Sequence, residues 1–110
     1  MATNYKILGQ SAPNATSNTD VYTVPSSTQA VISTITVVNR GATDATFRIA
    51  ARPDGVTLAN QHFFGGYDST VRANDVVALT LGVTLDAGDV ITVYASNANL
   101  SFNIFGSEIS

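Results

Sequence analysis

Hydrophobic and polar residues alternate along most of the chain with a period of two, which is the pattern of half-buried β-strands. No window keeps an apolar stripe at helical spacing over three turns. Threonine and valine, which are stiff at χ1 and favour strands, are abundant, and serine and asparagine favour the turns between them. The pattern predicts about eight strands, at residues 5–10, 21–24, 30–39, 46–52, 62–67, 76–81, 90–96 and 100–105. The 62–67 segment, interrupted by Gly65-Gly66, is either a bulged strand or a loop rich in aromatic rings.

The alternation also predicts which side of each strand faces the core. In the 30–39 strand, Val31, Ile35 and Val37 fall on one face, and the partly apolar opposite face indicates a covered strand. The 46–52 strand follows after a short turn, so these two strands are expected to pair as a hairpin. The closing strand places Leu100, Phe102 and Ile104 on one face and Ser101, Asn103 and Phe105 on the other. This pattern predicts an all-β fold, an antiparallel β-sandwich or jelly roll.

The length of 110 residues allows one hydrophobic core, so residues 1–110 are expected to form a single domain. The polar stretch 11–20 contains Pro13, Asn14 and Asn18, which predict a loop or an extended arm. Pro53-Asp54-Gly55 predicts a turn, because proline presets φ and glycine accepts a positive φ.

Composition excludes several classes of function. The chain has no cysteine and therefore neither disulfides nor thiolate metal sites. A net charge of −3 argues against binding nucleic acid, which needs clustered basic residues. No segment has the length and hydropathy of a membrane span, and the first residues do not form a signal-peptide pattern, so we expect a soluble protein made in a cytoplasm.

The chain is also poor in catalytic chemistry. His62 is the only histidine, and no G-x-S-x-G nucleophile motif accompanies it. Asp44, Asp54, Asp86 and Asp89 each lie near a glycine, where aspartate usually forms turns. No calcium-loop pattern is present. We expect no catalytic site, no cofactor and no metal.

Aromatic and basic side chains remain as candidates for an interface. Phe105 falls on the opposite strand face from Phe102, and a second apolar face needs a partner unless Phe105 simply covers a corner of the sandwich. Arg48 and Arg52 share a strand face, where they could pair with carboxylates of a partner or of the same chain. With only 12% charged residues, the chain is expected to form a homo-oligomer. The interface candidates are Phe63, Phe64, Tyr67, Tyr94, Phe102, Phe105, Arg48 and Arg52.

Several segments together resemble a family of small virion structural proteins of tailed bacteriophages, especially phages of marine bacteria and cyanobacteria. The resemblance covers nearly the whole chain, and its segments are structural. They are Asn4-Tyr5-Lys6-Ile7-Leu8-Gly9-Gln10, Val21-Tyr22-Thr23-Val24-Pro25, Ser33-Thr34-Ile35-Thr36-Val37 with Asn39-Arg40, Thr46-Phe47-Arg48-Ile49-Ala50, and the stretches 89–96 and 102–109. The resemblance implies a non-enzymatic part of a virion. Residues 85–105 are also similar in layout to the last strands of trimeric jelly rolls of the complement and tumour-necrosis type.

Within a virion, a capsid decoration or cement protein is the role expected from these features. Such a protein would stabilise the shell as a homotrimer bound to the major capsid protein or to other virion proteins. One alternative is a tail, baseplate or fibre component, although no long fibre-forming segment is evident. Another is a carbohydrate-binding module for host adhesion, for which Phe63, Phe64 and Tyr67 could supply an aromatic platform.

Overall fold

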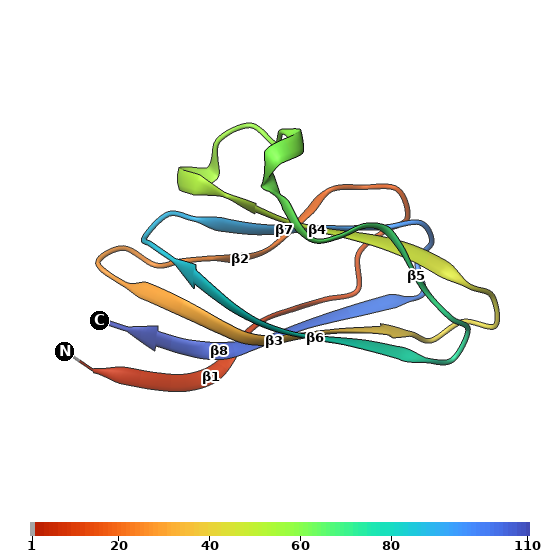
Figure 1. Cartoon of the computed structure of the whole chain (residues 1–110), viewed down its shortest axis with the longest axis horizontal. Helices are drawn as coiled ribbons and strands as arrows, with labels where there is room; N and C mark the ends of the chain where they lie inside the picture. The colour runs from red at the N-terminus through yellow and green to blue at the C-terminus, as the bar shows by residue number, and fades with distance from the viewer. Residues whose placement is uncertain (1) are drawn as a thin grey trace.

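The computed structural model describes residues 2–110, which form two four-stranded antiparallel sheets packed face to face (Figure 1). The first sheet has the order β1 (Thr3–Ser11), β8 (Leu100–Ile109), β3 (Gln29–Asn39) and β6 (Val76–Leu85). The second sheet has the order β2 (Thr19–Thr23), β7 (Val90–Ala95), β4 (Ala45–Arg52) and β5 (Phe63–Val71). Two short 3₁₀ turns, η1 (Pro53–Gly55) and η2 (Asn60–His62), lie between β4 and β5. Eight strands in this order form a jelly roll, and the predicted fold class is confirmed.

The predicted hairpin of residues 30–39 and 46–52 is wrong. β3 pairs with β6 and β8 in the first sheet, whereas β4 pairs with β5 and β7 in the second. The turn between them carries the chain from one sheet to the other. It is held by the Asn39 side chain, whose Nδ2 donates to the Thr43 and Val71 carbonyls at 2.8 and 3.1 Å. This crossing follows from the jelly-roll order, in which most consecutive strands belong to different sheets.

The predicted faces of β3 are wrong at its beginning and right at its end. Ile32, Ile35 and Val37 are fully buried, whereas Val31 lies on the outer side. Ser33 is the cause, because it is an extra residue relative to β8 and shifts the register between Ile32 and Thr34. A β-bulge of this kind reverses the side on which the preceding residues lie.

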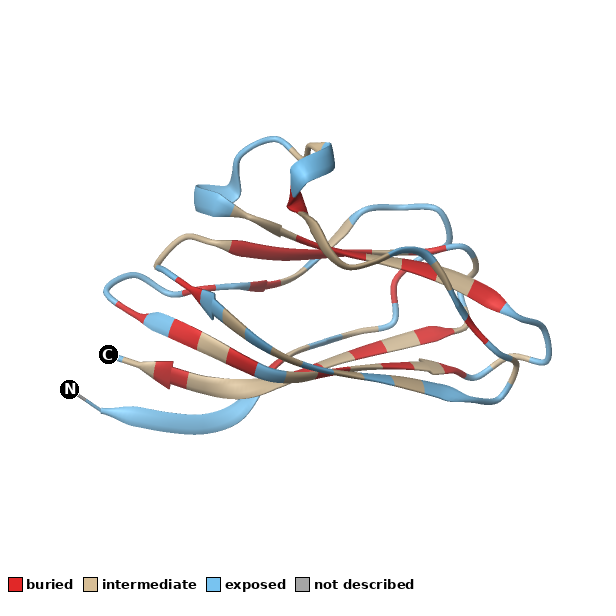
Figure 2. Cartoon of the chain, in the orientation of Figure 1, coloured by how far each residue is buried: buried red, intermediate tan, exposed pale blue. Residues whose placement is uncertain are grey.

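The core lies between the two sheets, where the buried segments of the strands face one another (Figure 2). Its largest fully buried side chains include Phe47, Phe102, Ile32, Ile35, Ile49, Ile91, Leu100 and Ile104. Phe47 and Phe102 come from different sheets and meet edge to face, with ring centroids 6.4 Å apart. The alternation predicted for the closing strand is confirmed, because Leu100, Phe102 and Ile104 are all buried.

The polar stretch 11–20 connects the two sheets. Ser11 ends β1, Thr19 and Asp20 begin β2, and Pro13 is buried. The Thr16 amide donates to the Ala95 carbonyl at 2.8 Å, so the segment is also fixed to the end of β7. Among residues 2–110, no helix has the length and hydropathy to cross a membrane.

A buried carboxylate links the two sheets at the end where the chain termini lie. Glu108 on β8 accepts a hydrogen bond from the Tyr22 hydroxyl on β2 at 2.6 Å. It also forms an ion pair with the Lys6 ammonium on β1 at 2.9 Å. These two contacts hold the pKa of Glu108 below its usual value, the Tyr22 hydrogen bond contributing most. Burial and the same carboxylate raise the pKa of Tyr22, which keeps its hydroxyl protonated as the donor.

We expect stability to decrease at acid pH through Glu108. Because the pKa is lower in the folded state, the carboxylate stabilises the fold above its unfolded-state pKa, and this contribution is lost as the pH falls through the folded-state pKa. Urea unfolding of the wild type and Glu108→Gln at several pH values between 7 and 3 measures the effect. The wild type should be more stable at pH 7, and the difference should shrink at the acid end. A difference that is constant across this range would contradict the assignment.

Candidate assembly surface

On the outer side of the first sheet, none of the described outward-facing strand residues is charged, and we call the surface that they form the uncharged face. Strand pairing places residues that are directly opposite each other on the same side of a sheet, so the members of the face follow from the register. They are Thr3, Tyr5, Ile7 and Gln10 on β1; Ser101, Asn103, Phe105, Ser107 and Ile109 on β8; Gln29, Val31, Thr34, Thr36 and Val38 on β3; and Val76, Ala78, Thr80 and Thr84 on β6.

Apolar side chains on this face are exposed. Tyr5 is 87% exposed and Ile7 50%, and Phe105, Val31 and Ile109 are partly exposed. A shallow hollow of about 480 Å³ lies between Tyr5 and Ile7 on one side and Val31 and Ser33 on the other, and it is also lined by Lys6, Phe105, Gly106 and Ser107. Exposed apolar side chains on a surface without charges are typical of a surface that a partner covers.

Two charges border the face directly: Lys6 lines its hollow, and Arg40 contacts Ser101, one of its members. Lys6 and Glu108 belong to the inner side of the sheet, where they pair with each other. Arg40 lies at one end of the sheet, where its Nε donates to the Ser101 hydroxyl and its Nη2 to the Ala98 carbonyl, both at 2.9 Å. Apart from Lys6, which is paired with Glu108, and Arg40 at the end of the sheet, the described residues of the face offer no ion whose desolvation would oppose a partner.

The outer side of the second sheet differs because the chain covers part of it. The segment 53–62, with η1 and η2, extends above this sheet (Figure 1). Ala50 and Thr92, which are paired across β4 and β7, are buried although they alternate with the core residues Ile49 and Ile91. This part of the second sheet is therefore not available to a partner.

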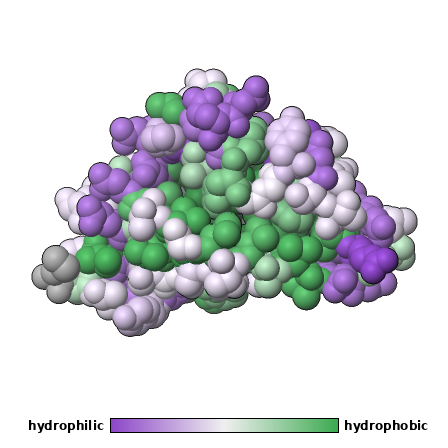
Figure 3. All heavy atoms as spheres, in the orientation of Figure 1, coloured by the Kyte–Doolittle hydropathy of each residue, from purple (hydrophilic) through white to green (hydrophobic). Residues whose placement is uncertain are grey.

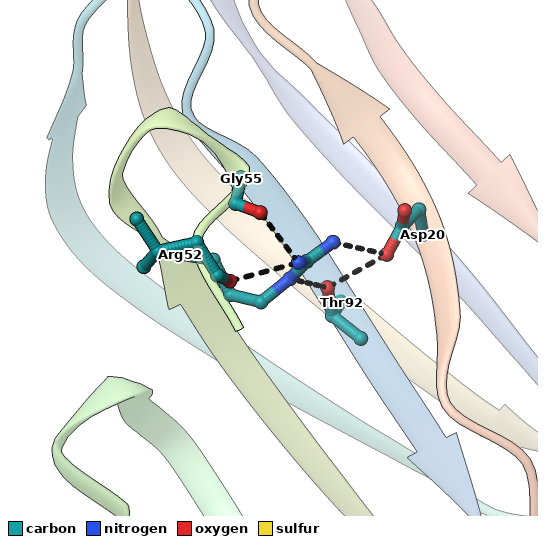
Figure 4. Close-up of polar contacts among 5 residues, drawn as sticks. Asp20, Arg52, Gly55 and Thr92 are labelled. Carbon is teal, nitrogen blue, oxygen red and sulfur yellow. Dashed lines mark hydrogen bonds and ion pairs between the residues drawn. The ribbon is translucent and has the colours of Figure 1, made fainter. Parts of the chain in front are cut away.

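Arg52 anchors this segment to the second sheet (Figure 4). Its Nη1 donates to the carbonyls of Gly55 and Val56 at 3.0 and 2.9 Å. Its Nε donates to the Thr92 hydroxyl at 3.0 Å, and its Nη2 pairs with Asp20 at 2.9 Å. The guanidinium donates hydrogen bonds within its own chain, so Arg52 stabilises the loop and needs no carboxylate from another subunit.

Arg48 also has its partners within the chain. Its Nε and Nη2 donate to the two carboxylate oxygens of Asp68 at 2.7 and 3.2 Å, and this contact lowers the pKa of Asp68. The guanidinium carbon lies 4.2 Å from the ring centroid of Tyr67 and 4.3 Å from that of Tyr94. Tyr67 also meets Phe63 edge to face at 4.9 Å. These residues form one cluster on the outer side of the second sheet.

The structure therefore separates the interface candidates from the sequence into three groups. Phe102 is a core residue with no exposed surface, and Phe64 is half-buried and packs against the core. Phe63, Tyr67, Tyr94, Arg48 and Arg52 lie on the outer side of the second sheet. Phe105 alone belongs to the uncharged face.

Sequence reasoning missed most members of the uncharged face. Tyr5, Ile7, Val31 and Thr36 are distant along the chain and come together only through strand pairing. A signal was nevertheless present, because alternate positions of all four strands lack charged residues. Without the pairing, these positions could not be assigned to one surface.

The described residues offer little for catalysis. The ring of His62 is buried, and its Nδ1 accepts a hydrogen bond from the Ala59 amide at 3.0 Å within η2. Asp86 and Asp89 hold their own turn, since Asp89 accepts from the Asp86 amide at 2.8 Å and Asp86 from the Ala87 amide at 2.8 Å. Across residues 2–110, no three or more histidine, aspartate or glutamate side chains are grouped so that they could hold a metal ion.

Comparisons with known proteins give no family for this chain. A scan against protein-family models and searches of curated proteins and of solved structures found no match.

Proposed function

We propose that the chain is a non-catalytic structural protein of a phage particle, specifically a capsid decoration protein that self-associates as a homotrimer through the uncharged face. The single observation that carries self-association is the absence of charged residues from the outward positions of all four strands of a sheet that also exposes Tyr5 and Ile7. The placement in a virion is suggested by the segment resemblance described above. The jelly roll is compatible with it, since this architecture is common among viral capsid proteins and equally serves lectins and cupins.

The size of the face supports a stable contact. Four strands spaced about 4.8 Å apart, with a longest dimension of about ten residues at about 3.4 Å each, give a flat area of about 600 Å². A standard protein interface buries about 800 Å² of accessible surface on each partner. Because side chains add to the flat area, the uncharged face is large enough for most of such an interface.

The chemistry of the face fits a structural role. A decoration protein stabilises a shell by adding buried contact area and needs no reacting group. Threonine, serine, asparagine and aliphatic side chains supply such contact without the cost of desolvating ions. The charged clusters of Arg48 and Arg52 occupy the opposite side of the molecule, which would then face the solvent.

Two measurements test this proposal. Light scattering of the purified chain at micromolar concentration should give about 35 kDa, three times the chain mass of 11.5 kDa. Quantitative gels of purified phage particles that carry the gene should give hundreds of copies per particle, as expected for a shell protein. A few dozen copies or fewer would instead favour the tail or baseplate. A monodisperse species of 11.5 kDa would contradict self-association.

A further inference from the structure

β6 is an edge strand that lacks most of the usual protection against pairing. It is the last strand of the first sheet and extends over ten residues, Val76–Leu85, without a charged residue or a proline. Its pairing with β3 has one register shift, which lies opposite Ser33. Soluble proteins usually protect such edges with charges, prolines, short strands or bulges, because the free backbone groups bind other chains.

The other three edge strands are better protected. β1 contains Lys6 and a register shift near Gly9. β2 has only five residues, including Asp20. β5 contains Asp68, and its pairing with β4 is irregular at two places. β6 is therefore the edge strand with the least protection against pairing with another chain.

The inner side of β6 is also incompletely covered. Val77, Leu79, Leu81 and Val83 form an aliphatic row that is only half-buried, whereas the inward residues Ile32, Ile35 and Val37 of neighbouring β3 are fully buried. β5, the edge strand of the opposite sheet, has Gly65 and Gly66 in its first half and so provides few side chains there. Figure 3 shows hydrophobic atoms in a band along the middle of the molecule, between the two sheets of Figure 1.

We propose that copies of this chain associate head to tail, with the β6 edge of one copy lying across the uncharged face of the next. The inference rests on the proposed self-association and specifies its geometry. The partner of an aliphatic row must be uncharged, because a charge buried against it would have no counterion. The strand residues of the uncharged face meet this condition, and the hollow of about 480 Å³, where Lys6 already has Glu108 as its counterion, can receive protruding side chains.

The polar groups of the face suit the backbone of an edge strand. A partner that covers β6 must satisfy amide and carbonyl groups that have no neighbouring strand, or the contact loses free energy. Hydroxyl and amide side chains both donate and accept hydrogen bonds, and Thr34, Thr36 and Asn103 lie in the middle of the face. Pairing of two β6 edges side by side would satisfy the backbone, but it would leave the aliphatic row facing a gap between the second sheets.

This geometry determines the symmetry of the assembly. A contact between two different surfaces leaves one of each surface free on every pair, and further copies add as a ring when the rotation between copies closes, or as an open filament when it does not. A trimer is such a ring. Face-to-face or edge-to-edge contacts use the same surface twice and stop at a two-fold dimer.

Mixing two variants tests the proposal. Thr36→Lys places a charge in the uncharged face, and Leu81→Lys places one in the aliphatic row, where the long side chain can reach solvent in the free chain. Thr70→Lys, at an exposed position of β5, is the matched control. Light scattering and native mass spectrometry measure the mass, and circular dichroism verifies the fold. If Leu81→Lys does not fold, Leu81→Gln replaces it.

Each of the first two variants should lose at least about tenfold in affinity, because an unpaired charge is buried in the contact, and the control should keep the wild-type mass. A 1:1 mixture of the two defective variants should form a heterodimer of about 23 kDa, since one supplies an intact edge and the other an intact face. If only one of the two variants, Thr36→Lys or Leu81→Lys, dissociates, the same surface is used on both copies. That result overturns the head-to-tail proposal and leaves self-association in place. If both dissociate and the mixture stays monomeric, the head-to-tail geometry is also overturned. A monomeric wild type would overturn the proposed function as well.

Discussion

Gly106→Ala is expected to prevent folding or to reduce the free energy of unfolding by more than about 3 kcal/mol. Gly106 lies in the middle of the first sheet, where β8 pairs with β1 on one side and β3 on the other. A Cβ atom at this position would collide with the Val31 carbonyl oxygen and lie 3.0 Å from the Ile32 Cα. Both atoms belong to the backbone beside the Ser33 bulge, so relief requires the sheet itself to move.

Gly82→Ala provides the matched control for this prediction. Gly82 lies on the exposed edge strand β6, and a Cβ atom there meets nothing within 4 Å. Alanine at this position should therefore change the free energy of unfolding, measured by urea unfolding, by less than about 0.5 kcal/mol or raise it slightly. Equal effects of the two substitutions would show that loss of glycine flexibility, and not collision with β3, determines the result.

The second large effect is expected from Phe102→Ala, which should reduce the free energy of unfolding by about 3–5 kcal/mol. Phe102 is fully buried and contacts Phe47 across the two sheets, so its removal leaves a cavity in the centre of the core. A domain of this size has a total stability of about 5–15 kcal/mol, and the variant would retain little of it. Urea or thermal unfolding followed by circular dichroism measures the loss.

Phe105→Ala separates folding from assembly on the same strand. Phe105 is only partly buried and belongs to the uncharged face, so its truncation should cost less stability than that of Phe102. It should instead weaken self-association, which light scattering over a dilution series detects. A Phe105→Ala chain that associates as tightly as the wild type would show that this ring lies outside the contact.

The strands could be predicted from the sequence because their chemistry is local. Period-two alternation, together with turn residues such as Pro53 and Gly55, located seven of the strands and assigned the faces of β8 correctly, whereas the 62–67 segment, left open between a strand and a loop, forms the start of β5. The same alternation failed at Val31, because an extra residue at Ser33 leaves no mark in a strand whose two faces are both rich in valine, isoleucine and threonine.

Strand pairing could not be predicted, and the candidate site depends on it. A short turn after Asn39 is compatible with a hairpin and with a crossing between sheets, and long-range contacts decide between them. The uncharged face combines residues as distant as Tyr5 and Ser107, which become neighbours only in the folded sheet. Tyr67 was an interface candidate in the sequence, but it packs against Arg48 on the outer side of the second sheet, opposite the uncharged face.

The Arg52-anchored segment has a consequence for how the molecule could be engineered. Because this segment covers part of the outer side of the second sheet while the uncharged face is exposed, the two outer sides of the molecule are distinct. Val56 and Thr57 are exposed residues of this segment, which extends above the second sheet (Figure 1). A peptide inserted between them would be displayed on the side of each copy opposite the uncharged face.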